Sequence, residues 1–256
     1  MQRYFISPQA LGSHEASIIG DDAYHLIRVM RVAPGEQVIV CDGVNRECLA
    51  EVTALGKDEV KLRIMEERPP RGEPRTAVWI AQSLPKGDKL ETVIQKGTEI
   101  GASAFIPFIS ARTVVHYDKN KEVKRLERWR KIAKEAAEQA HRSRMPTIQE
   151  TASWQALLAL AQEAQVAFFC YEKAAEQSFS EALNERLTQA SVDASESPFT
   201  GPILIVIGPE GGFTEQEAEQ AKAAGCIPVS LGQRILRTET AGLVALSSLM
   251  FATGEL

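Results

Sequence analysis

From residue 77 to the C-terminus, short apolar runs alternate with segments of helical periodicity, and this alternation constrains the fold more than any other feature. Runs typical of strands occupy residues 77–82, 104–109, 166–171, 203–207 and 227–231. Segments with one apolar helical face occupy residues 88–100, 121–141, 153–164, 178–189 and 214–224, and a last one begins near Glu239. Such alternation predicts an α/β fold. Several runs lack the period-two pattern of a half-exposed strand, which predicts a mostly parallel sheet with helices on both faces.

The first part of the chain follows a different pattern. β-rich runs separated by turn signals predict a small antiparallel β-barrel or sheet, and they occupy residues 37–42, 46–55 and 60–66. Ahead of them, Asp21 or Asp22 can cap a short helix that runs to about Arg31. Residues 68–74 read Arg-Pro-Pro-Arg-Gly-Glu-Pro and break regular structure. We therefore predict a β-barrel domain over residues 1–72 and an α/β domain over residues 73–256.

Composition and residue spacing exclude several classes of protein. The apolar share of 44% and charged share of 25% are those of an ordinary globular protein. The longest aliphatic stretch, residues 203–207, is too short to span a membrane, and residues 1–12 lack the features of a signal peptide. The four cysteines form no C-x-x-C pair, and the four histidines show no metal-binding spacing. We expect a cytoplasmic protein with reduced cysteines, no membrane segment and no metal.

Charge is distributed unevenly along the chain. The net charge of -5 argues mildly against a nucleic-acid partner when it is taken for the whole molecule. Residues 119–144, however, hold ten Lys or Arg against four Glu, whereas residues 172–197 hold six acids against two basic residues. The basic segment is either a solvated helix face or a surface for a polyanion.

The most informative segment follows the apolar run at residues 203–207. Residues 208–213 read Gly-Pro-Glu-Gly-Gly-Phe, and Thr214 with Glu217 then predicts a capping box that starts a helix. Glycines let backbone groups approach a ligand closely, and ligands bind at the carboxyl ends of strands in an open α/β sheet. A plain tight β-α turn is the alternative. The chain contains neither G-x-G-x-x-G here nor a P-loop anywhere, so the motifs for NAD and ATP are missing.

A second loop of the same kind follows the next apolar run. Residues 231–242 read Leu-Gly-Gln-Arg-Ile-Leu-Arg-Thr-Glu-Thr-Ala-Gly, a long polar stretch with two arginines ahead of the last helix. By itself it has a simple explanation, in which Arg234 and Arg237 are solvated and Thr238 caps the helix. Two loops of ligand-binding type at consecutive strand ends nevertheless favour one shared site.

Together the two loops closely resemble the cofactor motifs of SPOUT methyltransferases, and within that class the bacterial family that methylates N3 of a uridine in 16S ribosomal RNA. The Ser-Leu-Asn-x-Ser element of the related 2'-O-ribose methyltransferases is absent from the second loop. The resemblance covers nearly the whole chain and implies an N-terminal PUA-like domain and a C-terminal α/β trefoil knot. It also implies S-adenosylmethionine as cofactor, the small ribosomal subunit as substrate, and a homodimer with the last helix in its interface. Periodicity alone predicts only an ordinary doubly wound sheet.

The resemblance also implies roles for individual residues. Those expected to bind the cofactor are Ile207, Gly208, Pro209, Glu210, Gly211, Gly212, Leu231, Gly232, Ile235, Leu236, Arg237, Thr240 and Ala241. For catalysis, Glu210 and Glu239 are the candidate bases and Arg237 the candidate stabiliser of a uracil oxyanion. Glu239 is equally well explained as a first-turn helix acid. The expected RNA contacts are His25, Arg28, Arg31, Arg46, Lys124, Arg128, Lys131 and Arg142.

Three other functions remain open from the sequence. The nearest is methylation of a ribose 2'-hydroxyl. The second is a non-catalytic RNA-binding or assembly factor that retains the fold. The third is a nucleotide-dependent enzyme that uses the first glycine loop to hold phosphate.

Overall fold

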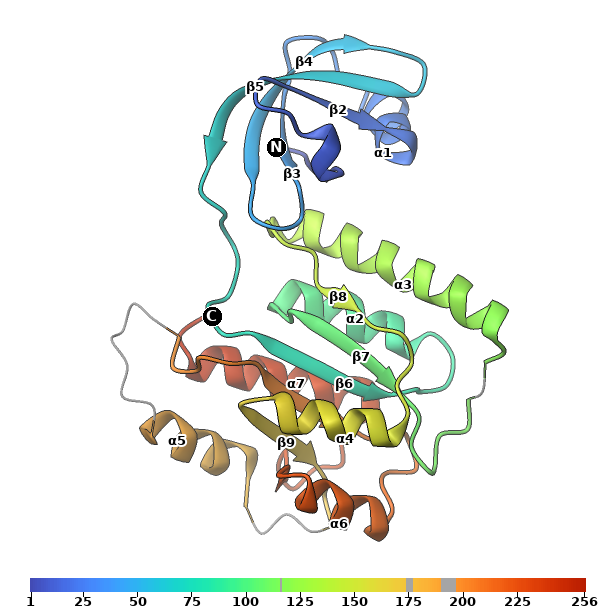
Figure 1. Ribbon diagram of the computed structural model, residues 1–256, viewed down its shortest axis with the longest axis vertical. Helices are drawn as coiled ribbons and strands as arrows, with labels where there is room; N and C mark the ends of the chain where they lie inside the picture. The colour runs from blue at the N-terminus through green and yellow to red at the C-terminus, as the bar shows by residue number, and fades with distance from the viewer. Residues whose placement is uncertain (116, 174–176, 190–196) are drawn as a thin grey trace. The chain divides into compact units, whose positions relative to one another are not determined.

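The computed structural model describes residues 1–115, 117–173, 177–189 and 197–256, which form two compact units (Figure 1). The N-terminal unit comprises residues 1–73 and 134–145, and the C-terminal unit comprises residues 74–133 and 146–256. The division into domains at residues 72 and 73 stays a prediction. Residues 134–145 are part of the N-terminal compact unit, although they lie beyond that predicted boundary.

The N-terminal unit is built on a five-stranded sheet in the order β1-β3-β4-β5-β2. Its strands are β1 (Arg3–Phe5), β2 (Glu15–Ile19), β3 (Gln37–Cys41), β4 (Glu47–Leu55) and β5 (Glu59–Arg68). β1 pairs with β3 in parallel and the other pairs are antiparallel. Register shifts in the β4–β5 pair, between Leu49 and Ala50 and between Val52 and Ala54, are bulges of the kind that bend a sheet. The expected small β domain is present, with β1 and β2 in addition to the three predicted strands.

The first helix differs from its prediction at its start. α1 (Gly20–Tyr24) continues into a π-helical turn, η2 (His25–Val29), and its N-cap is Ile19, which makes no side-chain cap hydrogen bond in the described structure. Asp21 and Asp22 lie inside the first turn, where carboxylates interact favourably with the helix dipole. The prediction that either residue caps the helix is wrong, although the helix itself is present. A second short helix in this unit is η1 (Pro8–Ala10).

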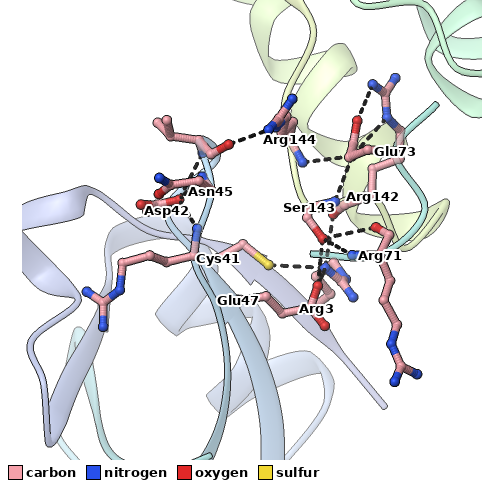
Figure 2. A network of polar contacts seen from close by, with 12 residues as sticks. Arg3, Cys41, Asp42, Asn45, Glu47, Arg71, Glu73, Arg142, Ser143 and Arg144 are labelled. Atoms are coloured by element: carbon pink, nitrogen blue, oxygen red, sulfur yellow. Dashed lines mark hydrogen bonds and ion pairs between the residues drawn. The ribbon is translucent and has the colours of Figure 1, made fainter. Parts of the chain in front are cut away.

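A polar network ties residues 142–144 to the sheet of the N-terminal unit (Figure 2). The buried guanidinium of Arg3 donates from Nη1 to Glu47 Oε2 at 2.8 Å and to the carbonyl oxygen of Arg142 at 3.1 Å. The hydroxyl of Ser143 donates to the same Glu47 carboxylate at 2.6 Å. Glu73 accepts from Arg142 Nη2 at 2.8 Å. These contacts explain why this segment belongs to the N-terminal unit.

The C-terminal unit contains a six-stranded sheet in the order β11-β9-β10-β6-β7-β8, in which every pair is parallel. Its strands are β6 (Val78–Ser83), β7 (Ala104–Phe108), β8 (Thr147–Ile148), β9 (Val166–Cys170), β10 (Ile203–Ile207) and β11 (Ile227–Val229). β10 lies between β9 and β6 and is buried along its whole length. Parallel strands covered on both faces confirm the predicted α/β class.

Helices cover both faces of this sheet (Figure 1). Residues of α2 (Lys89–Ile100), α3 (Lys119–Gln139), α5 (Phe179–Gln189) and α7 (Thr238–Ala252) share one apolar cluster with the sheet. Those of α4 (Trp154–Glu163) and α6 (Glu215–Ala223) share the cluster on the opposite face. The predicted strands and helices occur within a few residues of their expected ends, and the two-residue β8 is an addition. Strand order does not specify threading, so the knot stays a prediction from the resemblance.

Candidate functional site

The first glycine loop connects β10 to α6 as expected. Thr214 is the N-cap of α6, and its hydroxyl accepts from the amide of Glu217 while the Glu217 carboxylate accepts from the amide of Thr214. The capping box is confirmed. The other carboxylate oxygen of Glu217 accepts from the amide of Ala111 at 2.7 Å, which ties the segment after β7 to the start of α6. The end of the loop is therefore held by the capping box and by the amide of Ala111.

The two glycine-rich loops are joined by direct hydrogen bonds. The hydroxyl of Thr238, the first residue of α7, donates to the carbonyl oxygen of Gly208 at 2.6 Å. The same hydroxyl accepts from Nε2 of Gln82 at 2.8 Å. Gln82 is fully buried in β6, the strand next to β10. A chain of hydrogen bonds thus runs from β6 through the end of the second loop to the start of the first.

Three charged side chains meet beside these loops. Lys89, at the start of α2, lies 2.9 Å from Oε1 of Glu210 in the first loop and 3.5 Å from Oε2 of Glu239 in α7. Oε1 of Glu210 also accepts from the backbone amide of Lys86 at 3.1 Å. Burial raises the pKa of Glu210, but its hydrogen bonds outweigh that effect and hold the pKa below the usual value. The two predicted candidate bases therefore share one ammonium group.

A further contact reaches the first loop from the segment after β7. Nη1 of Arg112 donates to the carbonyl oxygen of Gly211 at 2.8 Å, and its side chain lies on the surface. Hydrogen bonds among three buried hydroxyls link this segment to the end of β6. The hydroxyls are those of Ser83, Ser110 and Thr113, and they lie 2.9 to 3.0 Å from one another. Arg112 consequently places a positive charge at the rim of the glycine loop.

The glycines of both loops leave space around the backbone. Gly212 has a φ of +65° and Gly232 a φ of +110°, and a Cβ built on either meets no described atom within 4 Å. Such φ values favour glycine. Gly208 is tighter, because its Cβ would lie 3.0 Å from the Phe213 ring. Open backbone at two strand ends suits a ligand that is held mainly through main-chain groups.

The remaining residues expected at the cofactor differ in exposure. Ile207 and Pro209 are buried, Leu231 and Leu236 are half-buried, and Ile235 is 86% exposed. Arg237 is exposed and serves as the N-cap of α7, where its carbonyl oxygen accepts from the amides of Thr240 and Ala241 at 2.9 Å. The sequence offered Thr238 as the cap of this helix. Thr238 does not cap it, because its hydroxyl is hydrogen-bonded to Gly208 instead. All of these residues lie in the C-terminal unit.

The expected RNA contacts are mostly exposed. His25, Arg28 and Arg31 lie on the surface of the N-terminal unit, and Lys124, Arg128 and Lys131 lie on the surface of α3 in the C-terminal unit. Within the N-terminal unit, Nδ1 of His25 forms a hydrogen bond with the Tyr4 hydroxyl at 3.0 Å.

Three arginines expected to contact RNA have protein partners. Nη2 of Arg128 pairs with Glu91 at 2.7 Å, and Arg46 pairs with Glu67 at 3.3 Å, but both side chains keep partial exposure. Arg142 is only 3% exposed, and Nη2 lies against Glu73 at 2.8 Å. Its sequence neighbourhood is basic, but its guanidinium is enclosed in the polar network of Figure 2, and we leave it out of the RNA surface proposed below.

Sequence reasoning missed Gln82, Lys89 and Arg112. Gln82 ends an otherwise apolar run, and a polar residue at the carboxyl end of a buried strand is the signal that could have drawn attention to it. Lys89 and Arg112 carried no such signal, because only the strand order brings them to Glu210 and Gly211.

Within the described ranges, no group of His, Cys, Asp and Glu side chains could hold a metal ion, and no helix is long and apolar enough to cross a membrane. His116, one of the four histidines, lies outside the described residues.

Comparison with known proteins identifies the family. Residues 72–250 match the model of an RNA methyltransferase domain, and residues 18–65 match that of an RNA methyltransferase PUA domain. The ribosomal RNA small subunit methyltransferase E of Bacillus subtilis is 43% identical, over 99% of this chain and 97% of its own. The chain belongs to the ribosomal RNA small subunit methyltransferase E family. The family member of Mycobacterium tuberculosis is 34% identical, over 94% of this chain and 87% of its own.

Solved structures of the same kind agree with this assignment. Ribosomal RNA small subunit methyltransferase E of Neisseria gonorrhoeae, bound to S-adenosylmethionine, superposes with a TM-score of 0.81 at 30% identity, covering 98% of each chain. A Legionella pneumophila protein described as a methyltransferase, with bound S-adenosylmethionine, gives a TM-score of 0.82 at 27% identity, covering 98% of this chain and 97% of its own. The fold class expected from the sequence, a SPOUT-type α/β domain with a PUA domain, is confirmed.

Proposed function

We propose that this chain transfers the methyl group of S-adenosylmethionine to N3 of a uridine in 16S ribosomal RNA of the small ribosomal subunit. The observation that carries the proposal is the 2.6 Å hydrogen bond from Thr238 to Gly208, which joins the two loops. The family member of Neisseria gonorrhoeae was solved with bound S-adenosylmethionine. The absence of the Ser-Leu-Asn-x-Ser element from the second loop favours the base over the ribose as methyl acceptor.

The residues present fit this cofactor. We assign its adenine and methionine portions to backbone groups of Leu231, Gly232, Ile235 and Leu236, with Gly208, Gly211 and Gly212 as the opposing wall. The open backbone at Gly212 and Gly232 supports the assignment. Ile207, Pro209, Arg237, Thr240 and Ala241 complete the proposed cofactor-binding set.

The chemistry assigned to the protein is alignment and charge control. The bound cofactor supplies a methyl group already activated by its sulfonium. Methylation of uracil N3 requires loss of the N3 proton and in-line approach of the nitrogen, so positioning the base contributes much of the rate. Arg237, exposed at the start of α7, is proposed to stabilise the uracil oxyanion. Glu210 and Glu239 are the proposed proton acceptors. Both contact the ammonium group of Lys89, which holds the two carboxylates near each other.

RNA binding is assigned to the exposed basic residues of each unit. His25, Arg28, Arg31 and Arg46 form the proposed surface of the N-terminal unit, and Lys124, Arg128 and Lys131 that of α3. Cationic side chains of this kind bind the phosphate backbone, so affinity should fall as salt concentration rises. We also propose a cytoplasmic location, because the proposed substrate is a ribosomal subunit.

We further propose that the chain acts as a homodimer through α7. The helix has two apolar faces, since Leu246, Leu249 and Met250 are buried within the unit while Phe251 is 76% exposed and Val244 36% exposed. Apolar residues in such a helix can be buried within one subunit or can form an interface between two. Leu246, Leu249 and Met250 are buried within the unit. We therefore propose that the exposed Phe251 and Val244 contact the second subunit.

A methyl-transfer assay tests whether the chain is an enzyme. Small ribosomal subunits from cells that lack the modification are incubated with the protein and methyl-labelled S-adenosylmethionine. The proposal predicts label in the ribosomal RNA, whereas a non-catalytic assembly factor would bind the subunits and leave them unlabelled. Calorimetric titration with S-adenosylhomocysteine and with ATP separates the remaining alternative, because an enzyme that holds phosphate in the first loop would bind ATP instead.

A further inference from the structure

Lys89 connects three segments that are distant in the sequence. It is the first residue of α2, and its ammonium group contacts Glu210 in the β10–α6 loop and Glu239 in the first turn of α7. All three side chains are partly exposed, at 29%, 31% and 21% for Lys89, Glu210 and Glu239. The three side chains therefore lie near the surface, although Oε2 of Glu239, the atom that faces Lys89, is itself buried.

The contacts of Lys89 link the two proposed cofactor loops by a second path. Thr238 joins the loops through Gly208 from the buried side, and Lys89 joins Glu210 to Glu239 from the exposed side. The amide of Lys86 adds a backbone contact to Glu210, so the turn ahead of α2 is held in the same arrangement. If Lys89 were absent, two carboxylates from opposite loops would face each other without a shared cation, and like charges would repel.

We infer that Lys89 is a positioning residue for methyl transfer, which fixes the spacing of the two loops by holding Glu210 and Glu239 to one ammonium group. This inference rests on the proposed function of the site. Lys89 acts through the two carboxylates, and no role in contacting the methyl acceptor is assigned to it. The lowered pKa of Glu210 and the raised pKa of Lys89, the latter caused chiefly by its hydrogen bond to Glu210, agree with this arrangement.

Lys96 offers a matched control on the same helix. The Lys96 side chain is 47% exposed, and its ammonium group pairs with Glu99 at 2.8 Å. Among the described residues it contacts neither loop. Lys89→Met and Lys96→Met remove the same charge from the same helix. Lys89→Arg retains a cation with several donors that can reach two carboxylates.

The experiment measures kcat, KM for S-adenosylmethionine and the pH profile of kcat for the wild type and the three variants, with labelled transfer to small subunits. We expect Lys89→Met to lower kcat by about 10- to 100-fold, as misplacement of reacting groups does. Lys89→Arg should recover most of that loss, and Lys96→Met should match the wild type. In Lys89→Met the acidic limb of the profile should move to higher pH, because Lys89 lowers the pKa of Glu210 and the carboxyl takes up a proton more readily without that cation.

Two results would overturn the inference. One is a Lys89→Met protein with the turnover and pH profile of the wild type. The other is a loss of activity that matches a loss of folded protein, measured by circular dichroism, with an unchanged acidic limb. Wild-type protein that transfers no methyl group overturns both the inference and the proposed function. Label found in a nucleoside other than 3-methyluridine overturns the proposed function alone.

Discussion

At the scale of single residues, Thr238 has a role that its sequence context hides. Just after Arg237 and ahead of an apolar helix, a threonine is expected to cap the helix. The structure instead makes Arg237 the N-cap, and the Thr238 hydroxyl links Gln82 to Gly208. Local sequence could not reveal this, because the partners are 156 and 30 residues away.

Thr238→Val tests this link. The substitution leaves the buried amide of Gln82 and the carbonyl of Gly208 without their shared partner, which should lower the free energy of unfolding by about 1–3 kcal/mol. Affinity for S-adenosylhomocysteine should also fall, since the first loop loses its tie to the second. Urea denaturation and calorimetric titration measure the two effects. Thr238→Ser keeps the hydroxyl and should behave as the wild type. Unchanged stability and affinity in Thr238→Val would disprove the link.

Arg237→Ala tests the assignment of charge stabilisation. The Arg237 side chain is exposed, so its loss should change the free energy of unfolding by no more than about 0.5 kcal/mol. We expect S-adenosylhomocysteine to bind as before while kcat falls by about 100-fold or more, the usual effect of removing a group that stabilises an oxyanion. The two measurements are compared on one preparation. If affinity and turnover fall together, Arg237 has a binding role instead.

At the scale of elements, structural features that depend on residues close together in the sequence were predicted well. Thr214 and Glu217 form the expected capping box because both partners lie within one helical turn. The cap predicted at Asp21 or Asp22 failed because α1 begins at Gly20, ahead of both residues. The sequence pattern identifies a helix from its apolar face. The residue at which this helix begins depends on where the preceding strand, β2, ends.

Two helical glycines give a matched test of packing. A Cβ on Gly97 in α2 would lie 2.8 Å from ring carbons of Phe105, which is fully buried. A Cβ on Gly242 in α7 would meet Ile207 at 3.5 Å, an ordinary contact. We expect Gly97→Ala to lower the free energy of unfolding by about 1–3 kcal/mol through overpacking. Gly242→Ala should raise it by about 0.5–1 kcal/mol through helix propensity. Equal effects in equilibrium denaturation would contradict the packing described for α2.

At the scale of the whole molecule, long-range arrangement was beyond sequence reasoning. Periodicity predicted the strands of the parallel sheet. It could not place β10 between β9 and β6, because the residues of a strand do not specify which strands pair with it. That order brings Gln82 and Lys89 to the glycine loops. In the same way, the basic composition of residues 119–144 suggested an RNA contact at Arg142, whereas long-range pairing with Glu73 buries it.

The buried Arg3–Glu47 pair should make the N-terminal unit sensitive to acid. Burial raises the pKa of Glu47, but hydrogen bonds from Arg3 and Ser143 outweigh it and lower the pKa below the usual value. A depressed carboxyl pKa stabilises the fold above the unfolded pKa, and the stabilisation is lost as pH falls through the folded pKa.

Glu47→Gln should therefore lower the free energy of unfolding at neutral pH by about 3–5 kcal/mol, because Arg3 is left buried without its counter-charge. It should also lose less stability than the wild type on further acidification below about pH 4. Glu66→Gln, at a carboxyl 58% exposed and paired with Arg68, is the control. Its effect should stay below about 1 kcal/mol. Parallel wild-type and Glu47→Gln curves of stability against pH would show that Glu47 does not contribute this sensitivity.

Identification of the methylated nucleoside shows whether the protein methylates N3 of uracil. Ribosomal RNA from small subunits lacking the modification is digested to nucleosides after incubation with the protein and S-adenosylmethionine, and the products are separated by liquid chromatography and mass spectrometry. We expect 3-methyluridine in the wild-type reaction, and strongly reduced amounts of it with Arg237→Ala. A 2'-O-methylated nucleoside, or no new methylated nucleoside, would contradict the proposed function.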